Sequence, residues 1–116
     1  MTWSIDARIP VWLGSLGELG AGDAVLVQGA GEVGAGAVER FEPEPLAHAA
    51  ACGCCAGRSA AAQALDRLFQ RRARGEVGFF RRVLAVTSSE AGDLEVWSAL
   101  RNDAVASARF RVEDRA

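Results

Sequence analysis

The stretch Ala24-Val25-Leu26-Val27-Gln28 decides the fold class, because it is an uninterrupted run rich in β-branched residues. Such a run is typical of a strand that is buried on both faces in a parallel sheet. Val83-Leu84-Ala85-Val86-Thr87 has the same character and predicts a second buried strand. Glycine-rich segments at 14–23 and 29–36 lie on either side of the first run and are predicted to be loops.

Shorter apolar segments extend the predicted sheet. Ile9–Leu13 indicates a first strand, and Pro10 is expected at the edge of this strand. Ala37–Phe41 fits either a helical turn or a strand, and Phe110–Val112 fits a final strand. Between them, Glu42-Pro43-Glu44-Pro45 is predicted to be extended, because proline disfavours helix in the residue before it.

Two helical segments separate these strands. Ser59 is a suitable N-cap for a helix that ends before Gly75, and its apolar positions recur at helical spacing, at Ala61, Ala64, Leu65, Leu68 and Phe69. The arginines of this helix, Arg67, Arg71, Arg72 and Arg74, are interpreted as a solvated face.

Asp93 is predicted to cap the second helix, on which Leu94, Trp97 and Leu100 would share a face. Asn102-Asp103 is expected to interrupt it before Ala104–Arg109 resumes. Alternating strands and helices predict an α/β fold, a small mostly parallel sheet with flanking helices, in a single domain over residues 1–116.

The charge balance excludes several functions. All 13 basic residues are Arg, so neither a Schiff-base Lys nor a phosphate loop ending in Gly-Lys-Ser/Thr is possible. A net charge of −2 argues against nucleic acid as a partner. The chain has no apolar run of the ~20 residues that span a bilayer, so we expect no membrane partner. Met1–Pro10 does not resemble a secretory signal, and we therefore expect a cytoplasmic protein with reduced thiols.

The three cysteines form the strongest chemical signal. They are Cys52, Cys54 and Cys55, in a C-x-C-C pattern. Thiolates are soft ligands that suit zinc, cobalt or copper(I), whereas the alternative is three buried apolar thiols. A tetrahedral site would need a fourth ligand, for which water, a partner's side chain, His48 and Glu32 are candidates.

The segment Gly29-Ala30-Gly31-Glu32-Val33-Gly34 is a literal G-x-G-x-x-G after a strand. In a dinucleotide-binding fold, these glycines would open a helix and bring the backbone to a pyrophosphate. A helix and a second strand should follow within about 20 residues, but Glu-Pro-Glu-Pro stands there instead. We therefore interpret the segment as a glycine-rich loop.

Gly31-Glu32-Val33-Gly34 after an apolar strand, followed by Cys52-x-Cys54-Cys55, resembles the CobW family of P-loop GTPase metallochaperones. The likeness extends over residues 9–114 and includes Ile9-Pro10-Val11 at the first strand and Arg58 after the cysteines. The resemblance implies a truncated P-loop-GTPase-like layer. It also implies that Cys52, Cys54 and Cys55 hold a zinc or cobalt ion.

The departures from the family concern the nucleotide. The family's Gly-Phe-Leu-Gly-Ala-Gly-Lys-Thr-Thr and its helix are replaced by Gly14–Asp23, which runs straight into the next strand without a Lys. The family's Glu-Thr-Ser/Thr-Gly corresponds to Val86–Ser89, and its Asn-Glu-Phe to Gln28-Gly29-Ala30. Contacts to the β- and γ-phosphates and to magnesium are therefore lost, and no catalytic or GTP-binding residue is predicted.

The leading hypothesis is thus a CobW-like metal-binding pseudo-GTPase, related to the metallochaperones of the cobalamin pathway and without hydrolytic activity. Its partners would be a transition metal ion and a full-length CobW-type protein or another metal-receiving client. One alternative is a GTPase with an unorthodox phosphate loop at Gly14–Gly22. Another is a metal-free module that docks on a relative, because a sheet without its first helix should leave apolar surface uncovered.

Overall fold

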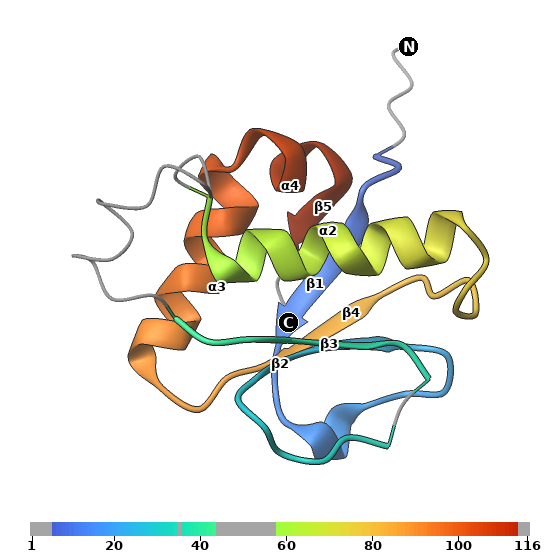
Figure 1. Cartoon of the computed structure of the whole chain (residues 1–116), viewed down its shortest axis with the longest axis horizontal. Coiled ribbons are helices and arrows are strands. Elements are labelled where there is room, and N and C mark those ends of the chain that lie inside the picture. The colour runs from blue at the N-terminus through green and yellow to red at the C-terminus, as the bar shows by residue number, and fades with distance from the viewer. Residues whose placement is uncertain (1–5, 35, 44–57, 114–116) are drawn as a thin grey trace, which may run out of the picture.

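A computed structural model describes residues 6–34, 36–43 and 58–113 of the chain. Its five strands are β1 (Ile9–Leu13), β2 (Ala24–Gln28), β3 (Val38–Phe41), β4 (Val83–Val86) and β5 (Phe110–Val112). They form one sheet in the order β3-β2-β4-β1-β5, in which every pair is parallel (Figure 1). The predicted α/β class is confirmed, and the ambiguous segment before Glu42 is a strand.

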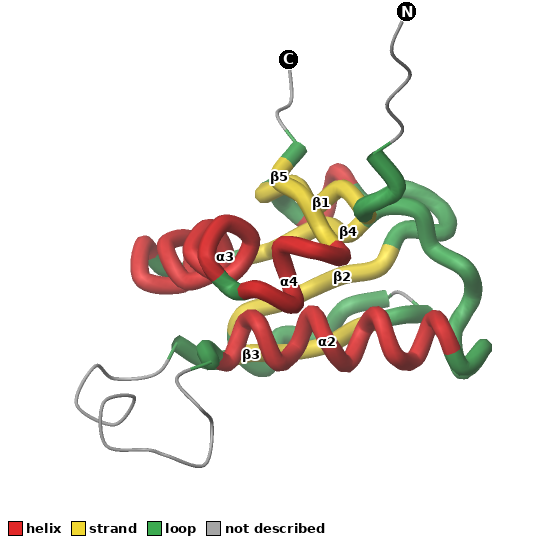
Figure 2. Tube along the Cα trace, turned by 90° about the horizontal axis from the view of Figure 1, so that it is seen from above, coloured by secondary structure: helices red, strands yellow, loops and turns green. Residues whose placement is uncertain are grey.

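The helices cover one face of this sheet. They are α2 (Ala60–Ala73), α3 (Glu90–Asn102) and α4 (Ala104–Arg109), and in Figure 2 they lie on the viewer's side of the sheet. The chain passes from β3 to β4 to β5 in one direction across the sheet through these helices. It passes from β1 to β2 to β3 in the other direction through connections on the opposite face (Figure 1). This arrangement is the one that right-handed crossovers require.

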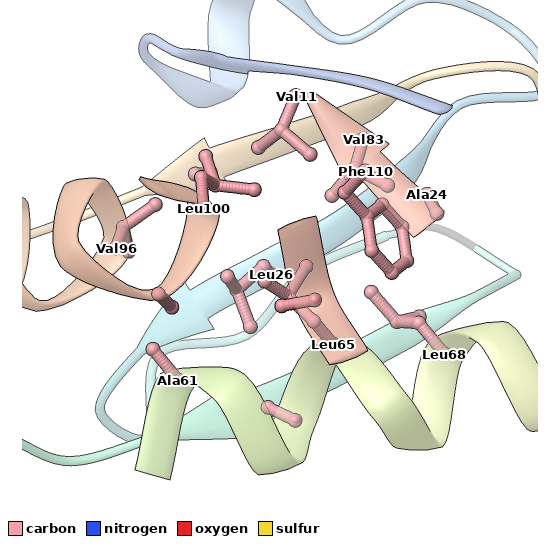
Figure 3. Packing of buried hydrophobic residues seen from close by; sticks show 14 of the residues in the cluster. Val11, Ala24, Leu26, Ala61, Leu65, Leu68, Val83, Val96, Leu100 and Phe110 are labelled. Carbon is pink, nitrogen blue, oxygen red and sulfur yellow. The ribbon is translucent and has the colours of Figure 1, made fainter. Parts of the chain in front are cut away.

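The main core lies between the sheet and the helices (Figure 3). Alternate residues of the strands point toward the helices, among them Val11, Leu26 and Val83. Leu65 of α2 and Val96 of α3 meet them there, and both are fully buried. Burying side chains of this size contributes roughly 1.5–3 kcal/mol each.

The opposite face of the sheet is also buried, although no described α-helix lies on it. Trp12, Leu84 and Val25 form one row across β1, β4 and β2, with exposed fractions of 5%, 0% and 0%. The connection at 14–23 and the described residues 29–34 and 36–37 lie on the side of this face (Figure 1). A Cβ atom at Gly14 would lie 3.1 Å from Leu84, so the glycine lets the backbone lie against that side chain. The expectation of uncovered apolar surface is therefore wrong at the centre of the sheet.

The connection from β1 to β2 contains one short 3-10 helix, η1 (Leu16–Glu18). Asp23 is the last residue of this connection, and it is buried. Its carboxylate accepts the Gly20 N–H at 2.8 Å and pairs with the guanidinium of Arg82. Arg82 in turn stacks on Trp12, with 4.4 Å from Cζ to the ring centroid. This ion pair ties the connection to the start of β4.

The boundaries of α2 match the prediction, whereas those of α3 do not. Ser59 caps α2 by accepting from the Ala62 N–H, and Gly75 follows the helix with a φ of +73°. The predicted N-cap Asp93 is wrong, since Ser89 caps α3 and Asp93 lies in its first turn, hydrogen-bonded to Thr87. Both residue types are good N-caps, so the local sequence did not separate them.

The buried face of α3 is also rotated from the predicted one. Leu94 is 65% exposed and Trp97 is half-buried, while Gly92, Val96, Ala99 and Leu100 face the core. A Cβ atom at Gly92 would lie 1.9 Å from Oε1 of Gln28, at the end of β2. The absence of a side chain at this position lets α3 approach the sheet closely, and this packing sets the helix face.

The outer edge of β3 is covered by arginines of α2. Arg71 donates to the Val38 carbonyl at 3.1 Å and Arg67 donates to the Arg40 carbonyl at 3.2 Å, and both carbonyls face away from β2. Both guanidiniums also bind the Glu39 carboxylate, at 3.0 and 2.7 Å. Two arginines of the predicted solvated face, Arg67 and Arg71, therefore bind β3. Their guanidiniums occupy the Val38 and Arg40 carbonyls, which would otherwise be free to accept from another strand.

Replacing both arginines, as Arg67→Ala with Arg71→Ala, should open this edge. We expect concentration-dependent self-association and a loss of about 1–2 kcal/mol in the free energy of unfolding, since each exposed pair contributes up to about 1 kcal/mol. Light scattering and urea denaturation measure the two effects. Arg74→Ala is the matched control, because Arg74 bonds only within its own helix end and the turn after it. Equal scattering from the double variant and the control would contradict the interpretation.

Candidate functional site at the carboxyl edge of the sheet

The carboxyl ends of the parallel strands bring three of the sequence motifs to one edge of the sheet. The segment at 14–18 follows β1, Gly29–Gly34 follows β2, and Thr87–Ser89 follows β4. The connection after β1 leaves toward one face, and the connection after its neighbour β4 leaves toward the other (Figure 1). In open α/β sheets, ligands bind at such a reversal. This edge is therefore the candidate functional site.

The turn after β1 is closed by its own carboxylate. Oε1 of Glu18 accepts the Ser15 N–H at 2.9 Å and lies 3.4 Å from the Ser15 hydroxyl. A Cβ atom at Gly14 would lie 2.6 Å from the same oxygen, so the carboxylate fills the inside of the turn. A phosphate loop leaves its backbone N–H groups for the phosphate and adds a cation. Here the turn supplies an anion of its own, and segment 14–23 contains no Arg or Lys.

The glycine-rich segment after β2 leads directly into β3. Gly29 has a φ of +88°, and its N–H donates to the Phe41 carbonyl. Arg40 donates to the Gly29 carbonyl at 3.0 Å. Because the described residues between β2 and β3 form no helix, Gly29–Gly34 does not open the helix that a dinucleotide fingerprint requires. Its interpretation as a loop is confirmed.

Gln28 joins the ends of β2 and β4. Its Nε2 donates to the Ser89 hydroxyl at 2.8 Å, and its Oε1 accepts the Ser88 N–H at 2.8 Å. The Ser89 hydroxyl also accepts the Gly92 N–H as the cap of α3. Thr87 is hydrogen-bonded to Asp93. The hydroxyls of Ser89 and Thr87 are thus used in structural contacts, and sequence reasoning did not predict the part played by Gln28.

The predicted metal ligands Cys52, Cys54 and Cys55 lie outside the described residues, as does His48. Glu32, the other candidate for a fourth ligand, is exposed in the connection from β2 to β3. β3 ends and α2 begins toward the same side of the molecule (Figure 2). Within residues 6–34, 36–43 and 58–113, no group of three or more His, Cys, Asp and Glu side chains could hold a metal ion.

Arg58, which follows the cysteines in the sequence, is held by two carboxylates. Its Nε and Nη2 donate to Asp103 at 2.8–3.0 Å, and its Nη1 binds Asp66. These hydrogen bonds raise the pKa of Arg58. Asp66 belongs to α2 and Asp103 separates α3 from α4, so this cluster fixes the start of α2 against the helix pair. The interruption of the helix at Asn102-Asp103 was predicted from the sequence, but its pairing with Arg58 was not.

Gly92→Ala tests the packing of α3 on Gln28. The added methyl group would displace the Gln28 side chain and break its bonds to Ser88 and Ser89. We expect the free energy of unfolding to fall by about 1–3 kcal/mol, as it does at other overpacked sites. Urea denaturation measures the change. Gly31→Ala, at a loop position with open space around the Cβ, should leave the midpoint nearly unchanged. Removing the Gln28 side chain as well, in Gln28→Ala with Gly92→Ala, should recover part of the loss; no recovery would contradict the proposed clash.

No helix in the described ranges is long and apolar enough to cross a membrane. Compared with known proteins, the chain matches no family model, no curated protein and no solved structure.

Proposed function

We propose that this chain is a CobW-like metal-binding protein that holds zinc or cobalt through the thiolates of Cys52, Cys54 and Cys55. The observation that carries the proposal is the C-x-C-C pattern itself, which puts three soft ligands within four residues. The protein would store the ion or pass it to a full-length relative or another client. It would act in a reducing compartment such as the cytoplasm, where thiols stay free.

The chemistry follows from the ligand set. Each thiol must lose its proton to bind, so metal uptake releases protons and weakens as the pH falls. Three thiolates leave one position of a tetrahedral site for water, a partner's side chain, His48 or Glu32. An exchangeable fourth position suits transfer, because an incoming ligand from a client can bind before the thiolates release the ion. A site closed by four permanent ligands is typical of structural zinc instead.

The turn after β1 supports the absence of GTPase activity in this proposal. Glu18 occupies the inside of the turn, and Asp23 accepts the Gly20 N–H. Both carboxylates bind backbone N–H groups of the kind that a phosphate loop presents to its nucleotide. A triphosphate placed there would meet two negative charges and no cation from the loop. The same geometry argues against the alternative of an unorthodox phosphate loop at Gly14–Gly22.

Metal analysis of the purified, reduced protein tests the thiolate site. We expect about one equivalent of zinc or cobalt, since such sites bind tightly, and its loss on replacing all three cysteines with Ser. Glu32→Gln is the matched control; it should change the content only if Glu32 supplies the fourth ligand. Cobalt absorption in the sulfur-to-metal charge-transfer region identifies thiolate ligands directly. Less than about a tenth of an equivalent, unchanged by removal of the thiols, would contradict the proposal.

A calorimetric titration with GTP and magnesium tests the nucleotide half of the proposal independently. We expect no saturable heat at high micromolar GTP, because the loop offers carboxylates where phosphate needs donors and cations. Titration with ADP at the same ionic strength controls for weak nonspecific anion binding. Saturable GTP heat that is lost when Gly14→Val blocks the turn would establish the phosphate-loop alternative instead.

A further inference from the structure

An exposed aromatic ring lies at the amino edge of the sheet, opposite the edge described above. Phe79, in the segment between α2 and β4, is 74% exposed, while its neighbour Phe80 is buried. The guanidinium of Arg72, from the end of α2, lies 3.7 Å from the Phe79 ring centroid and 5.3 Å from that of Phe80. Phe79 is therefore held against a cation while most of its surface faces solvent. The surface thus places an exposed aromatic ring beside a guanidinium, and both groups are enriched in protein interfaces.

Two hollows lie beside this ring. One has a volume of about 300 Å³ and the other about 320 Å³, and Ala21, Gly22, Asp23 and Phe79 line both of them. The first is also lined by Leu19, Gly20, Gly78 and Phe80, and by Gly34, Gly36 and Ala37 of the connection from β2 to β3. The glycines in this lining leave room for an apolar side chain from another molecule, which Leu19 and Phe80 would also contact. The Phe79 ring would form one side of its binding site.

The charge around the ring is positive, although the whole chain has a net charge of −2. Arg81 is exposed and Arg82 lines the second hollow. Only Arg82 has a carboxylate partner, Asp23, since no ion pair of Arg72 or Arg81 occurs in the described parts of the chain. The Nε atom of Arg72 is buried and has no hydrogen-bond partner among these residues. Burial without a carboxylate partner lowers the pKa of Arg72.

We propose that the Phe79 surface, made of Arg72, Phe79, Arg81, Arg82 and the two hollows, binds an acidic polypeptide segment of a partner protein. Carboxylates of that segment pair with Arg81 and lie in the field of Arg72, and an apolar side chain enters a hollow beside Phe79. Arginine is one of the residue types that most often dominate the energy of protein interfaces, and phenylalanine is enriched in them. The surface does not depend on the proposed thiolate site.

The composition of the hollows favours a polypeptide over nucleic acid. Asp23 lines both of them, and its carboxylate is already paired with Arg82 and the Gly20 N–H. A phosphate backbone would add charge beside this carboxylate on a protein that is acidic overall. An acidic peptide instead alternates its charges with apolar side chains, so it can place a neutral group next to Asp23.

Fluorescence anisotropy with the labelled peptide Glu-Glu-Phe-Glu-Glu-Leu-Glu-Glu tests the proposal on the full chain at low ionic strength. We expect saturable binding that Phe79→Ser and Arg81→Glu each weaken at least about tenfold, the effect of losing a residue that dominates an interface. Both side chains are exposed, so the substitutions leave the core intact, and circular dichroism verifies this. The same peptide with Lys in place of Glu should not bind.

Leu94→Ser and Arg101→Glu form the matched control pair. Leu94 is 65% exposed on α3, and Arg101 stacks on Trp97 nearby, so this pair has similar composition without the hollows. Both control variants should bind the acidic peptide as the unmodified protein does. The proposal is overturned by the absence of binding, by equal losses in the Phe79 and Leu94 variants, or by an oligothymidylate of equal charge that binds more tightly.

Discussion

The structure depends on the need to bury both faces of β2 and β4. Their side chains are apolar on the two sides of the sheet, so each face must be shielded from water. The described α-helices all lie on one side. Two glycine-rich connections run along the opposite side (Figure 1), where Trp12, Val25 and Leu84 are buried, and Gly14 lies against Leu84 because it has no side chain. The segments that resemble nucleotide-binding motifs thus serve as a covering layer in this fold.

This requirement explains which parts of the fold could be predicted from the sequence. The continuous apolar runs identified the central strands, and Ser59 and Gly75 marked the ends of α2 through local chemistry. The cover on the second face could not be predicted, because it depends on where Gly14 comes to lie relative to a strand some 70 residues later. The start and the buried face of α3 were predicted wrongly for a similar reason, since the contact between Gly92 and Gln28 decides them.

The candidate site also has parts that could be predicted from the sequence and parts that could not. The meeting of three motifs at the carboxyl edge follows from parallel strands, so it could be expected once the sheet was predicted. The two carboxylates that hold Arg58 come from residues 8 and 45 positions away. Only the folded chain brings them together. The cysteines were identified by residue type and spacing alone, which is why their chemistry is a proposal and the packing around Arg58 is a structural finding.

Arg58, Arg67 and Arg71 share one property. In each of them a planar guanidinium donates hydrogen bonds to two acceptors at once. A lysine ammonium matches this geometry poorly, and the chain contains neither Lys nor Tyr. Guanidinium groups stay protonated far into the alkaline range, where ammonium and phenol groups lose their protons. Guanidinium groups therefore suit ion pairs that must last as the pH rises, whereas thiols as a class lose their protons in the alkaline range. Alkali would change the chemistry of the cysteines while leaving the electrostatics that hold the sheet and helices together intact.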